Sequence, residues 1–256
     1  MTRYPIRLLQ LTDLHLLDDP AGEVQGVVTQ QALEAVIDHG LRHHPDTDLV
    51  LVTGDLVHDA GAQAYRRLRA TLERFQRPVY CLPGNHDRAS LLRRHLNSER
   101  VRAPGAARHG NWLILFLDSH VEGRVHGHLD GRQFDHLGRM LRASGAPYVL
   151  LCLHHPPVDL GSSWLDASRV DNGETLLSLV HMEPRIRALA FGHVHQAVHR
   201  LFDGRPLLGT PATCFQFLPG TEHCALDARP PGYRWIHLHE DGTLATGIER
   251  LPARPA

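Results

Sequence analysis

Five apolar segments of this chain each stop at a polar side chain of a type that binds metal ions. The segments fall within residues 8–15, 49–55, 79–87, 149–155 and 188–195. Each has the length and aliphatic content of a buried β-strand, and each runs into Asp, Asn or His. Open α/β sheets hold their ligand sites at the carboxyl ends of strands. The pattern therefore predicts an α/β fold in which five strand ends converge on oxygen and imidazole ligands.

The stretches around these strands indicate how the sheets are covered. We expect helices over residues 27–43, 62–75, 89–96 and 130–143, and a further strand over residues 112–117. Such alternation is typical of sheet layers covered by helices. Beyond residue 192 the pattern changes to short strands, expected over residues 197–202, 206–209, 233–238 and 243–249. No linker or repeat interrupts the chain, so we expect one domain over residues 1–256.

The balance of charge argues against a polyanionic partner. Lysine and arginine number 27 and aspartate and glutamate 28, which gives a net charge of −1. Long-range attraction to nucleic acid or to an acidic membrane is therefore not expected, although bound metal ions would still attract a small anion. No apolar run nears the length of about 18 residues that a membrane span needs, and no cleavable leader is recognised. We expect a cytoplasmic protein.

The four cysteines give no sign of a disulfide framework. They are Cys81, Cys152, Cys214 and Cys224, none of them in a C-x-x-C pair. The first two lie in strand-like apolar runs. We therefore expect buried, reduced thiols rather than disulfides or zinc ligands.

The polar residues at the strand ends form a candidate set of metal ligands. Two ligand-type residues alternate after the first strand and again after the fifth, a spacing that lets both chelate one ion. Each fragment alone is common in turns, where a structural role is the better interpretation, but the ordered set of five is not explained that way. The candidate ligands are Asp13, His15, Asp55, Asn85, either His154 or His155, His193 and His195.

The chemistry of this set favours two transition-metal ions. A mixture of Asp, His and Asn suits Mn, Fe or Zn better than Mg or Ca, which prefer oxygen ligands. A single structural zinc takes four ligands, usually with cysteine among them, and this set is larger and has no cysteine. Two-metal sites hold their ions about 3.5–4 Å apart and assist in-line displacement at phosphorus.

The ordered motifs D-x-H, G-D, G-N-H-D, H and G-H-x-H resemble those of the calcineurin-like metallophosphoesterases. The resemblance extends over residues 13–195 and implies two stacked β-sheets flanked by helices, an αββα sandwich. It also implies Asp13, His15, Asp55 and His195 on one ion, and Asp55, Asn85, His154 and His193 on the other. Asp55 would bridge the ions. The doublet of His154 and His155 leaves either residue open as the ligand, because side chains alternate if the strand continues.

Three further stretches are similar to a narrower group, the bacterial class III cyclic-AMP phosphodiesterases. They are residues 163–166 followed by Asn172, residues 209–217, and residues 231–234. This similarity implies hydrolysis of 3′,5′-cyclic AMP to 5′-AMP by a hydroxide that bridges the two ions. It also suggests a homodimer.

Five residues are given roles in that hypothesis. His86 would contact the phosphate or protonate the leaving oxygen, and Asp87 would orient His86. Asn85 would contact substrate as well as metal. Trp164 and Asn172 would shape the substrate pocket, although a surface loop with Trp164 packed inward explains them equally well.

Two other functions remain open at this point. The same metal core serves phosphoesterases that act on 2′,3′-cyclic nucleotides, glycerophosphodiesters or nucleic-acid ends, so the pocket decides the substrate. A non-catalytic protein-binding scaffold is the other alternative. That alternative predicts gaps in the ligand set, and the sequence has none.

Overall fold

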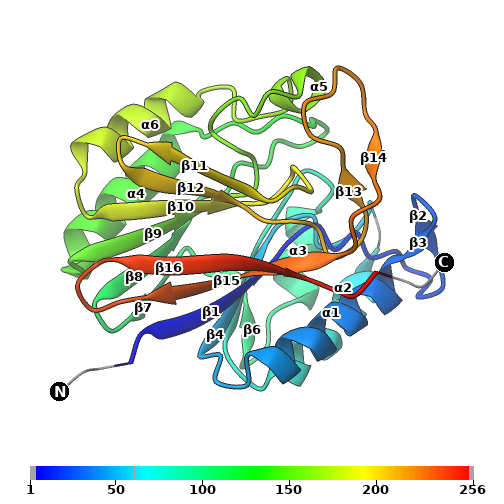
Figure 1. Ribbon diagram of the computed structural model, residues 1–256. Helices are drawn as coiled ribbons and strands as arrows, with labels where there is room; N and C mark the ends of the chain where they lie inside the picture. Colours follow the sequence, from blue (N-terminus) through cyan, green and yellow to red (C-terminus); the bar gives the residue numbers. More distant parts are fainter. Residues whose placement is uncertain (1–3, 60, 254–256) are drawn as a thin grey trace.

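Two six-stranded sheets stacked face to face form the centre of the molecule (Figure 1). The structure is a computed structural model that describes residues 4–59 and 61–253. The first sheet has the order β16-β15-β1-β4-β5-β6, with bounds β1 Ile6–Leu11, β4 Leu49–Thr53, β5 Val79–Leu82, β6 Val101–Arg102, β15 Gly232–Leu238 and β16 Leu244–Arg250. The second has the order β11-β12-β10-β9-β8-β7, with bounds β7 Ala106–His109, β8 Trp112–Phe116, β9 Tyr148–Cys152, β10 Ile186–Phe191, β11 Val198–Phe202 and β12 Arg205–Gly209.

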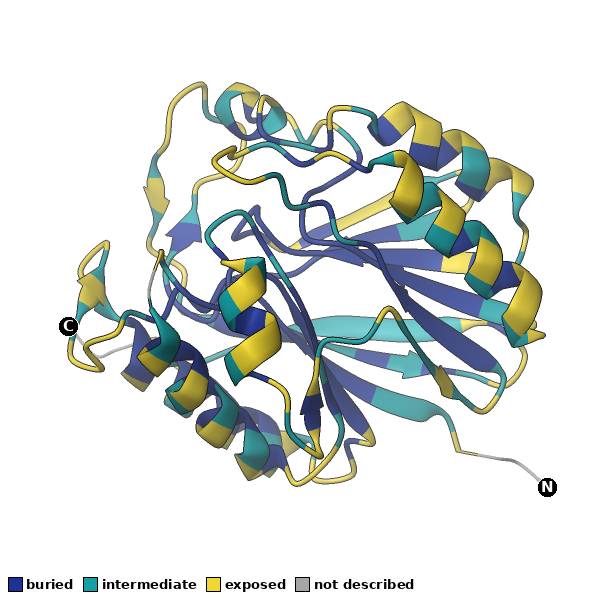
Figure 2. Ribbon diagram, turned by 180° about the vertical axis from the view of Figure 1, so that it is seen from behind, coloured by how far each residue is buried: buried dark blue, intermediate teal, exposed yellow. Residues whose placement is uncertain are grey.

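Helices cover the outer face of each sheet. They are α1 Thr29–His43, α2 Ala62–Leu72, the 3-10 turn η1 Glu73–Phe75, α3 Ala89–His95, α4 Gly131–Ser144, α5 Ser163–Asp166 and α6 Gly173–Met182. Two short hairpins complete the fold, β2 Glu23–Val24 with β3 Val27–Val28, and β13 Gln216–Phe217 with β14 Leu226–Asp227. Helices and strands present their buried residues to each other and their exposed residues outward (Figure 2). The predicted αββα sandwich is confirmed.

Strand β1 illustrates how alternation of side chains builds the layers. Leu8 lies in the apolar layer between the sheets, whereas Leu9 and Leu11 lie in the layer under α1 and α2. Both layers are apolar because β1 is central in its sheet and is covered on both faces.

Most predicted elements are found within a few residues of their expected bounds. Helix α1 begins at Thr29, because the first two residues of the predicted helix form β3 instead. Helix α6 was not predicted at all. Its apolar residues are nearly contiguous rather than spaced along one face, and Asn172 and Gly173 at its start are typical of a turn. Residues 163–166, taken as a loop, form the single helical turn α5.

The cysteines match the expectation of buried thiols at three of four positions, and the helices are short. Cys81, Cys152 and Cys214 are buried and free, but Cys224 is exposed, so the expectation of burial is wrong for that residue. The longest helix of residues 4–59 and 61–253 has 15 residues, and no helix there combines the length and apolar character needed to cross a membrane.

Parallel pairing brings the predicted strand ends to one edge of the sandwich. β1 pairs in parallel with β4, and β4 with β5, in the first sheet. β9 pairs in parallel with β10 in the second. The carboxyl ends of the two groups meet where His154, after β9, hydrogen bonds to the carbonyl oxygen of Thr53, the last residue of β4. The predicted ligands follow these five strands.

Candidate metal centre

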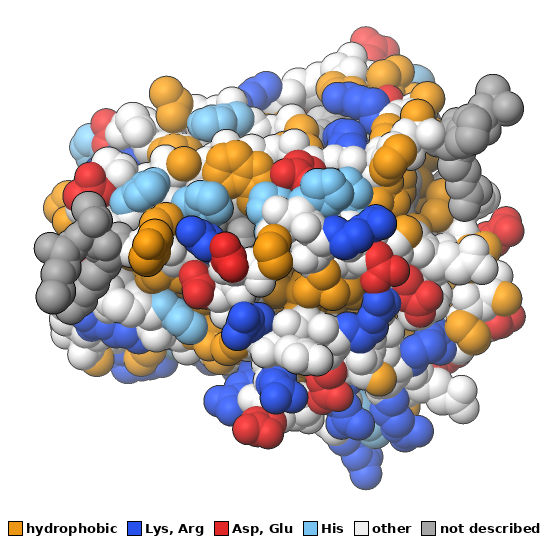
Figure 3. Space-filling view, turned by 60° about the horizontal axis from the view of Figure 1, so that its bottom comes forward, with side chains coloured by type: hydrophobic (Ala, Val, Ile, Leu, Met, Phe, Trp, Pro, Cys, Tyr) orange, Lys and Arg blue, Asp and Glu red, His pale blue; other side chains and the backbone are white. Residues whose placement is uncertain are grey.

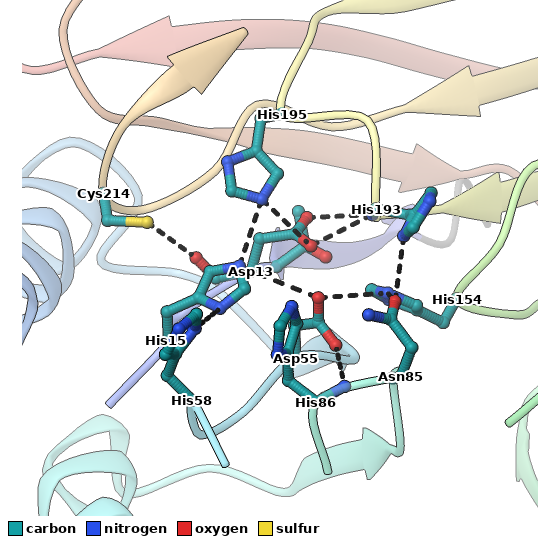
Figure 4. Close-up of polar contacts among 12 residues, drawn as sticks. Asp13, His15, Asp55, His58, Asn85, His86, His154, His193, His195 and Cys214 are labelled. Carbon is teal, nitrogen blue, oxygen red and sulfur yellow. Dashed lines mark hydrogen bonds and ion pairs between the residues drawn. The ribbon is translucent and has the colours of Figure 1, made fainter. Parts of the chain in front are cut away.

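One set of three predicted ligands comes from the ends of β1 and β10. His15 Nε2 lies 3.1 Å from His195 Nε2, and His195 Nε2 lies 3.5 Å from Asp13 Oδ1. All three side chains are buried, and their ligand atoms point toward one another (Figure 4). The strand ends thus bring two imidazoles and a carboxylate to one point.

A second set comes from the ends of β5, β9 and β10. Asn85 Oδ1 lies 3.2 Å from His154 Nε2 and 3.0 Å from His193 Nδ1. An amide oxygen thus faces two ring nitrogens.

Asp55 lies between the two sets. Its Oδ2 atom is 3.7 Å from His15 Nε2 in the first set and 3.4 Å from His154 Nε2 in the second. Its other oxygen, Oδ1, accepts a hydrogen bond of 3.0 Å from the backbone N–H of His86. That bond fixes the carboxylate with Oδ2 turned toward both sets.

Hydrogen bonds behind the imidazoles determine which nitrogen faces the centre. His154 Nδ1 donates to the carbonyl oxygen of Thr53, and His195 Nδ1 to that of Phe215, each at 2.8 Å. Because a carbonyl only accepts, Nδ1 carries a proton in both rings, and Nε2 is the nitrogen that faces the centre.

His193 is held in the opposite orientation. The Ser168 hydroxyl donates to the carbonyl oxygen of Leu165, so its oxygen accepts from His193 Nε2 at 2.8 Å. The lone pair of His193 is therefore on Nδ1, beside Asn85. Nitrogens of two imidazoles and an amide oxygen face one another here, a set of ligand atoms that suits a metal cation.

His155 is turned away from this point. Its Nδ1 lies 2.8 Å from Ser119 Oγ and its Nε2 lies 3.0 Å from the carbonyl oxygen of Val125. One of its nitrogens lies within 4.8 Å of ligand atoms of His154 and His193, but both nitrogens already have partners. The geometry therefore favours His154 as the ligand of this pair.

The backbone at the strand ends is strained. Asp13, His15, Asp55, His193 and His195 all have positive φ angles, of 54°, 49°, 49°, 68° and 48°. Residues other than glycine rarely adopt this left-handed conformation, and it is retained where surrounding structure enforces it for function. The glycine of the Gly-Asn-His-Asp turn is required by close approach, since a Cβ at Gly84 would lie 2.2 Å from Asp55 Oδ1.

Burial makes the centre attractive to positive charge. Burial raises the pKa of Asp13 to about 8, and it lowers the pKa of His193 to about 3 and that of His195 to about 4. Burial would also lower the pKa of His154, but the Asp55 carboxylate outweighs it and raises that pKa to about 9. A cation at this point relieves the cost of two buried carboxylates. The residues present therefore fit two metal ions.

Asp87 does not orient His86, and that prediction is wrong. The Asp87 carboxylate is buried and accepts from the backbone N–H groups of Leu56, Val57 and Gly84, and from the Tyr65 hydroxyl at 2.9 Å. These four hydrogen bonds engage both carboxylate oxygens and hold the turn after β5. His86 Nδ1 instead lies 3.2 Å from Asp59 Oδ2.

The two predicted pocket residues have different surroundings. The Trp164 ring meets Phe217 edge to face at 4.8 Å between centroids, and Phe217 lies 4.4 Å from the ring of His195. Trp164 is therefore linked to the centre by one aromatic side chain. The Asn172 amide pairs with the backbone of Leu129 through both its oxygen and its nitrogen. Its polar atoms tie α6 to the preceding loop, which contradicts the expectation that it binds substrate.

Sequence reasoning missed three residues beside the centre. His58 Nδ1 lies 3.1 Å from His15 Nδ1, and its ring stacks on His86 with centroids 4.6 Å apart. Asp59 pairs with His86, and Ser168 orients His193. The position of His58 and Asp59 shortly after Asp55, at the end of the same strand, was the available signal. Nothing in the sequence near Ser168 indicates its role.

Comparison with known proteins identifies the family of this chain. The family model for calcineurin-like phosphoesterases matches residues 6–197. A 3′,5′-cyclic adenosine monophosphate phosphodiesterase of Pseudomonas aeruginosa is 36% identical over 246 residues, which is 96% of this chain and 90% of that protein. A 3′,5′-cyclic-nucleotide phosphodiesterase of a Nostoc species is 35% identical over 98% of this chain and 94% of its own length.

Solved structures agree on the fold. A dimetal phosphatase from Danio rerio superposes with a TM-score of 0.69 at 17% identity, over 92% of this chain and 94% of that one. A purple acid phosphatase from yellow lupin gives a TM-score of 0.71 at 13% identity, over 97% of this chain and 53% of that one. Fold, ordered motifs and relatives lead to one assignment: the chain belongs to the calcineurin-like phosphoesterase family.

Proposed function

We propose that this protein hydrolyses 3′,5′-cyclic AMP to 5′-AMP at a dinuclear metal centre. The observation that carries the proposal is Asp55 Oδ2, which faces His15 in one ligand set and His154 in the other. Relatives that are 34–37% identical over 96% of the chain, and that bear the name of this activity, support the choice of substrate.

We assign seven residues to the two ions. One ion would be held by Asp13, His15, Asp55 and His195, and the other by Asp55, Asn85, His154 and His193. His154 and His195 would bind through Nε2 and His193 through Nδ1, as their outer hydrogen bonds require. His15 would bind through Nε2, the nitrogen that faces His195 and Asp55. The ligand types favour Mn or Fe, with Zn as the further candidate.

The bound ions would supply positive charge that offsets the charge gathering on the phosphoryl oxygens and lowers the pKa of water. In the reaction a water oxygen forms a bond to phosphorus, the bond from phosphorus to the ribose 3′ oxygen breaks, and that oxygen takes up a proton. His86 is suited to contact the phosphate or to give this proton, because its backbone holds Asp55 while its ring stands beside His15 at 5.0 Å between centroids. Asp59 Oδ2 holds its Nδ1 atom and so orients the ring.

Trp164 would line the substrate pocket. It is half-buried and is linked to the centre through Phe217, which places its ring where it could contact a flat purine base. We keep the expectations of a homodimer in the cytoplasm as part of this proposal. Light scattering on the purified protein and fractionation of cells test them.

Analysis of nucleotide products tests the proposal. Manganese-loaded protein is incubated with 3′,5′-cyclic AMP, and the products are separated by chromatography. We expect 5′-AMP from the native protein and none from Asp55→Ala. Absence of product from protein that holds two ions would move the substrate to another phosphoester, and 3′-AMP would show that the other phosphorus–oxygen bond is cleaved.

A further inference from the structure

His58 lies beside the candidate metal centre but is not one of its proposed ligands. The chain has 21 histidines, and Figure 3 shows several histidine side chains at the surface on one face, so the presence of a histidine does not by itself indicate a function. His58 is distinguished by its contacts. Its ring meets two residues of the centre, His15 and His86.

The backbone fixes the position of His58 relative to His15. Leu16, which follows His15, forms a parallel β-bridge with Val57, which precedes His58. The backbone N–H of His58 donates to the carbonyl oxygen of Leu16 at 2.9 Å, and the N–H of His15 donates to that of Asp55 at 3.0 Å. The loops after β1 and β4 are therefore joined through their backbones, and the His58 side chain can be replaced without removing these bonds.

One ring nitrogen of His58 faces the outer nitrogen of His15. The two Nδ1 atoms lie 3.1 Å apart, and a dashed line marks this contact in Figure 4. On the other side of its ring, His15 Nε2 lies 3.1 Å from His195 Nε2. An imidazole that binds an ion through Nε2 is neutral and carries its one proton on Nδ1. In the metal-loaded centre of the proposed function, on which this step rests, His15 Nδ1 therefore donates and His58 Nδ1 accepts.

His15 differs from the other candidate histidine ligands in the partner behind its ring. His154 and His195 face backbone carbonyl oxygens, and His193 faces a serine hydroxyl. Within the part of the chain that the structure describes, His15 Nδ1 has no hydrogen-bond partner other than His58. Such outer partners fix the orientation of histidine ligands and increase metal affinity. His15 thus depends on a side chain that can be substituted.

The ring of His58 also packs against His86. The two rings are stacked, with centroids 4.6 Å apart and planes at 22°. His86 pairs through Nδ1 with Asp59, the residue after His58. Two consecutive residues therefore hold the ring that is proposed to contact the phosphate or to give the proton, and both restrict its orientation.

We infer that His58 is a positioning residue that accepts a hydrogen bond from His15 and packs against His86. It acts through these two neighbours and is not itself a ligand. Without the acceptor the His15 ring is free to turn, which weakens binding of the ion that His15 would hold with Asp13 and His195. Without the ring of His58, His86 loses its stacking partner.

Two substitutions of His58 separate these contacts. His58→Phe preserves a flat ring beside His86 but cannot accept, so we expect the affinity for one Mn²⁺ ion to fall about 10- to 100-fold. His58→Asn places an oxygen acceptor near the position of Nδ1, so it should recover most of that affinity. It should also lower turnover of bis(p-nitrophenyl) phosphate, because the stacking on His86 is lost.

Dialysis against buffered Mn²⁺, with metal counted by mass spectrometry, measures the affinities without any substrate. His181→Phe and His181→Asn change an exposed histidine that is paired with Asp203, and as matched controls they are expected to alter neither metal affinity nor turnover. We expect the metal-free His58 variants to melt at the native temperature, because the backbone bonds of the loop remain.

Full Mn²⁺ affinity in His58→Phe would overturn the inference. An equal loss of affinity in His58→Phe and His58→Asn would also overturn it, because packing rather than the hydrogen bond would then support His15. Unchanged turnover in His58→Asn would remove the role toward His86. Native protein that binds fewer than two Mn²⁺ ions would overturn the proposed metal centre itself, whereas the affinities decide the role of His58 whether or not cyclic AMP is the substrate.

Discussion

The strand-end centre and the contact where the end of α1 meets β15 and β16 contain the same kinds of side chain but are built differently. The centre draws its candidate ligands from five strand ends, with buried carboxylates and five residues at positive φ. The contact lies on a helix and strands with ordinary backbone angles, and the Glu249 carboxylate in it accepts hydrogen bonds from Tyr233 and His44. These protein groups satisfy that carboxylate, whereas the strained backbone and the facing ligand atoms of the centre suit a bound cation.

The largest effect is expected at the residue shared by the two ligand sets. Asp55→Asn removes the charge that faces both His15 and His154, so we expect loss of at least one ion and a fall in turnover of about 10³-fold or more. Metal content and initial rates are measured together. The exposed Asp171→Asn serves as the control, and an Asp55 variant with full metal content would contradict the bridging role.

Substitutions of the neighbouring His154 and His155 should have different effects, one on metal content and the other on stability. His154→Ala is expected to lose one ion, because its Nε2 faces Asn85 and Asp55. His155→Ala should keep both ions and lose stability instead, since it breaks hydrogen bonds with Ser119 and Val125. Metal counts with thermal melts on both variants measure this, and loss of metal from His155→Ala would reverse the assignment.

Substitutions of His86 and of its partner Asp59 should lower turnover without loss of metal ions. His86→Ala is expected to retain both ions and lose about 10²- to 10⁴-fold in turnover. Asp59→Asn should lose less, about tenfold, because it only orients the ring. Metal loss in His86→Ala would instead identify His86 as a ligand.

Substitution of Asp87, in contrast, should lower stability rather than turnover. Asp87→Ala leaves three backbone N–H groups and the Tyr65 hydroxyl without their acceptor, and we expect a loss of about 3 kcal/mol in the free energy of unfolding. Denaturant unfolding measures it. A stable variant with reduced turnover would return Asp87 to a catalytic role.

The smallest effect is expected at the pocket rim. Trp164→Ala should raise KM for cyclic AMP several-fold with little change in kcat, because it removes aromatic contact but no ligand. Asn172→Ala should leave KM unchanged and lower stability by about 1–2 kcal/mol, since its amide pairs with the Leu129 backbone. Steady-state kinetics on both variants test these expectations. A rise in KM confined to Asn172→Ala would show that Asn172, and not Trp164, lines the substrate pocket.

The sequence predicted those features that depend on residues close together in the chain. The strands before Asp13, Asp55 and His193 each end two residues before that polar residue, so strand and ligand type are visible together. Parallel pairing then brings these ends together without further information.

What could not be predicted depends on contacts between distant residues. The tautomer of His195 is fixed by the carbonyl of Phe215, and that of His193 by Ser168. The role of Asp87 was misjudged because adjacency to His86 in sequence says nothing about side-chain direction in a tight turn. Asn172 was misjudged because its partner, Leu129, lies 43 residues away.

Anomalous X-ray scattering from crystals of the manganese-loaded protein tests the central claim most directly. We predict two manganese peaks about 3.5–4 Å apart on either side of Asp55 Oδ2, one beside His15 and His195 and the other beside Asn85, His154 and His193. A single peak, or a second peak bound to His155 instead of His154, would contradict the account.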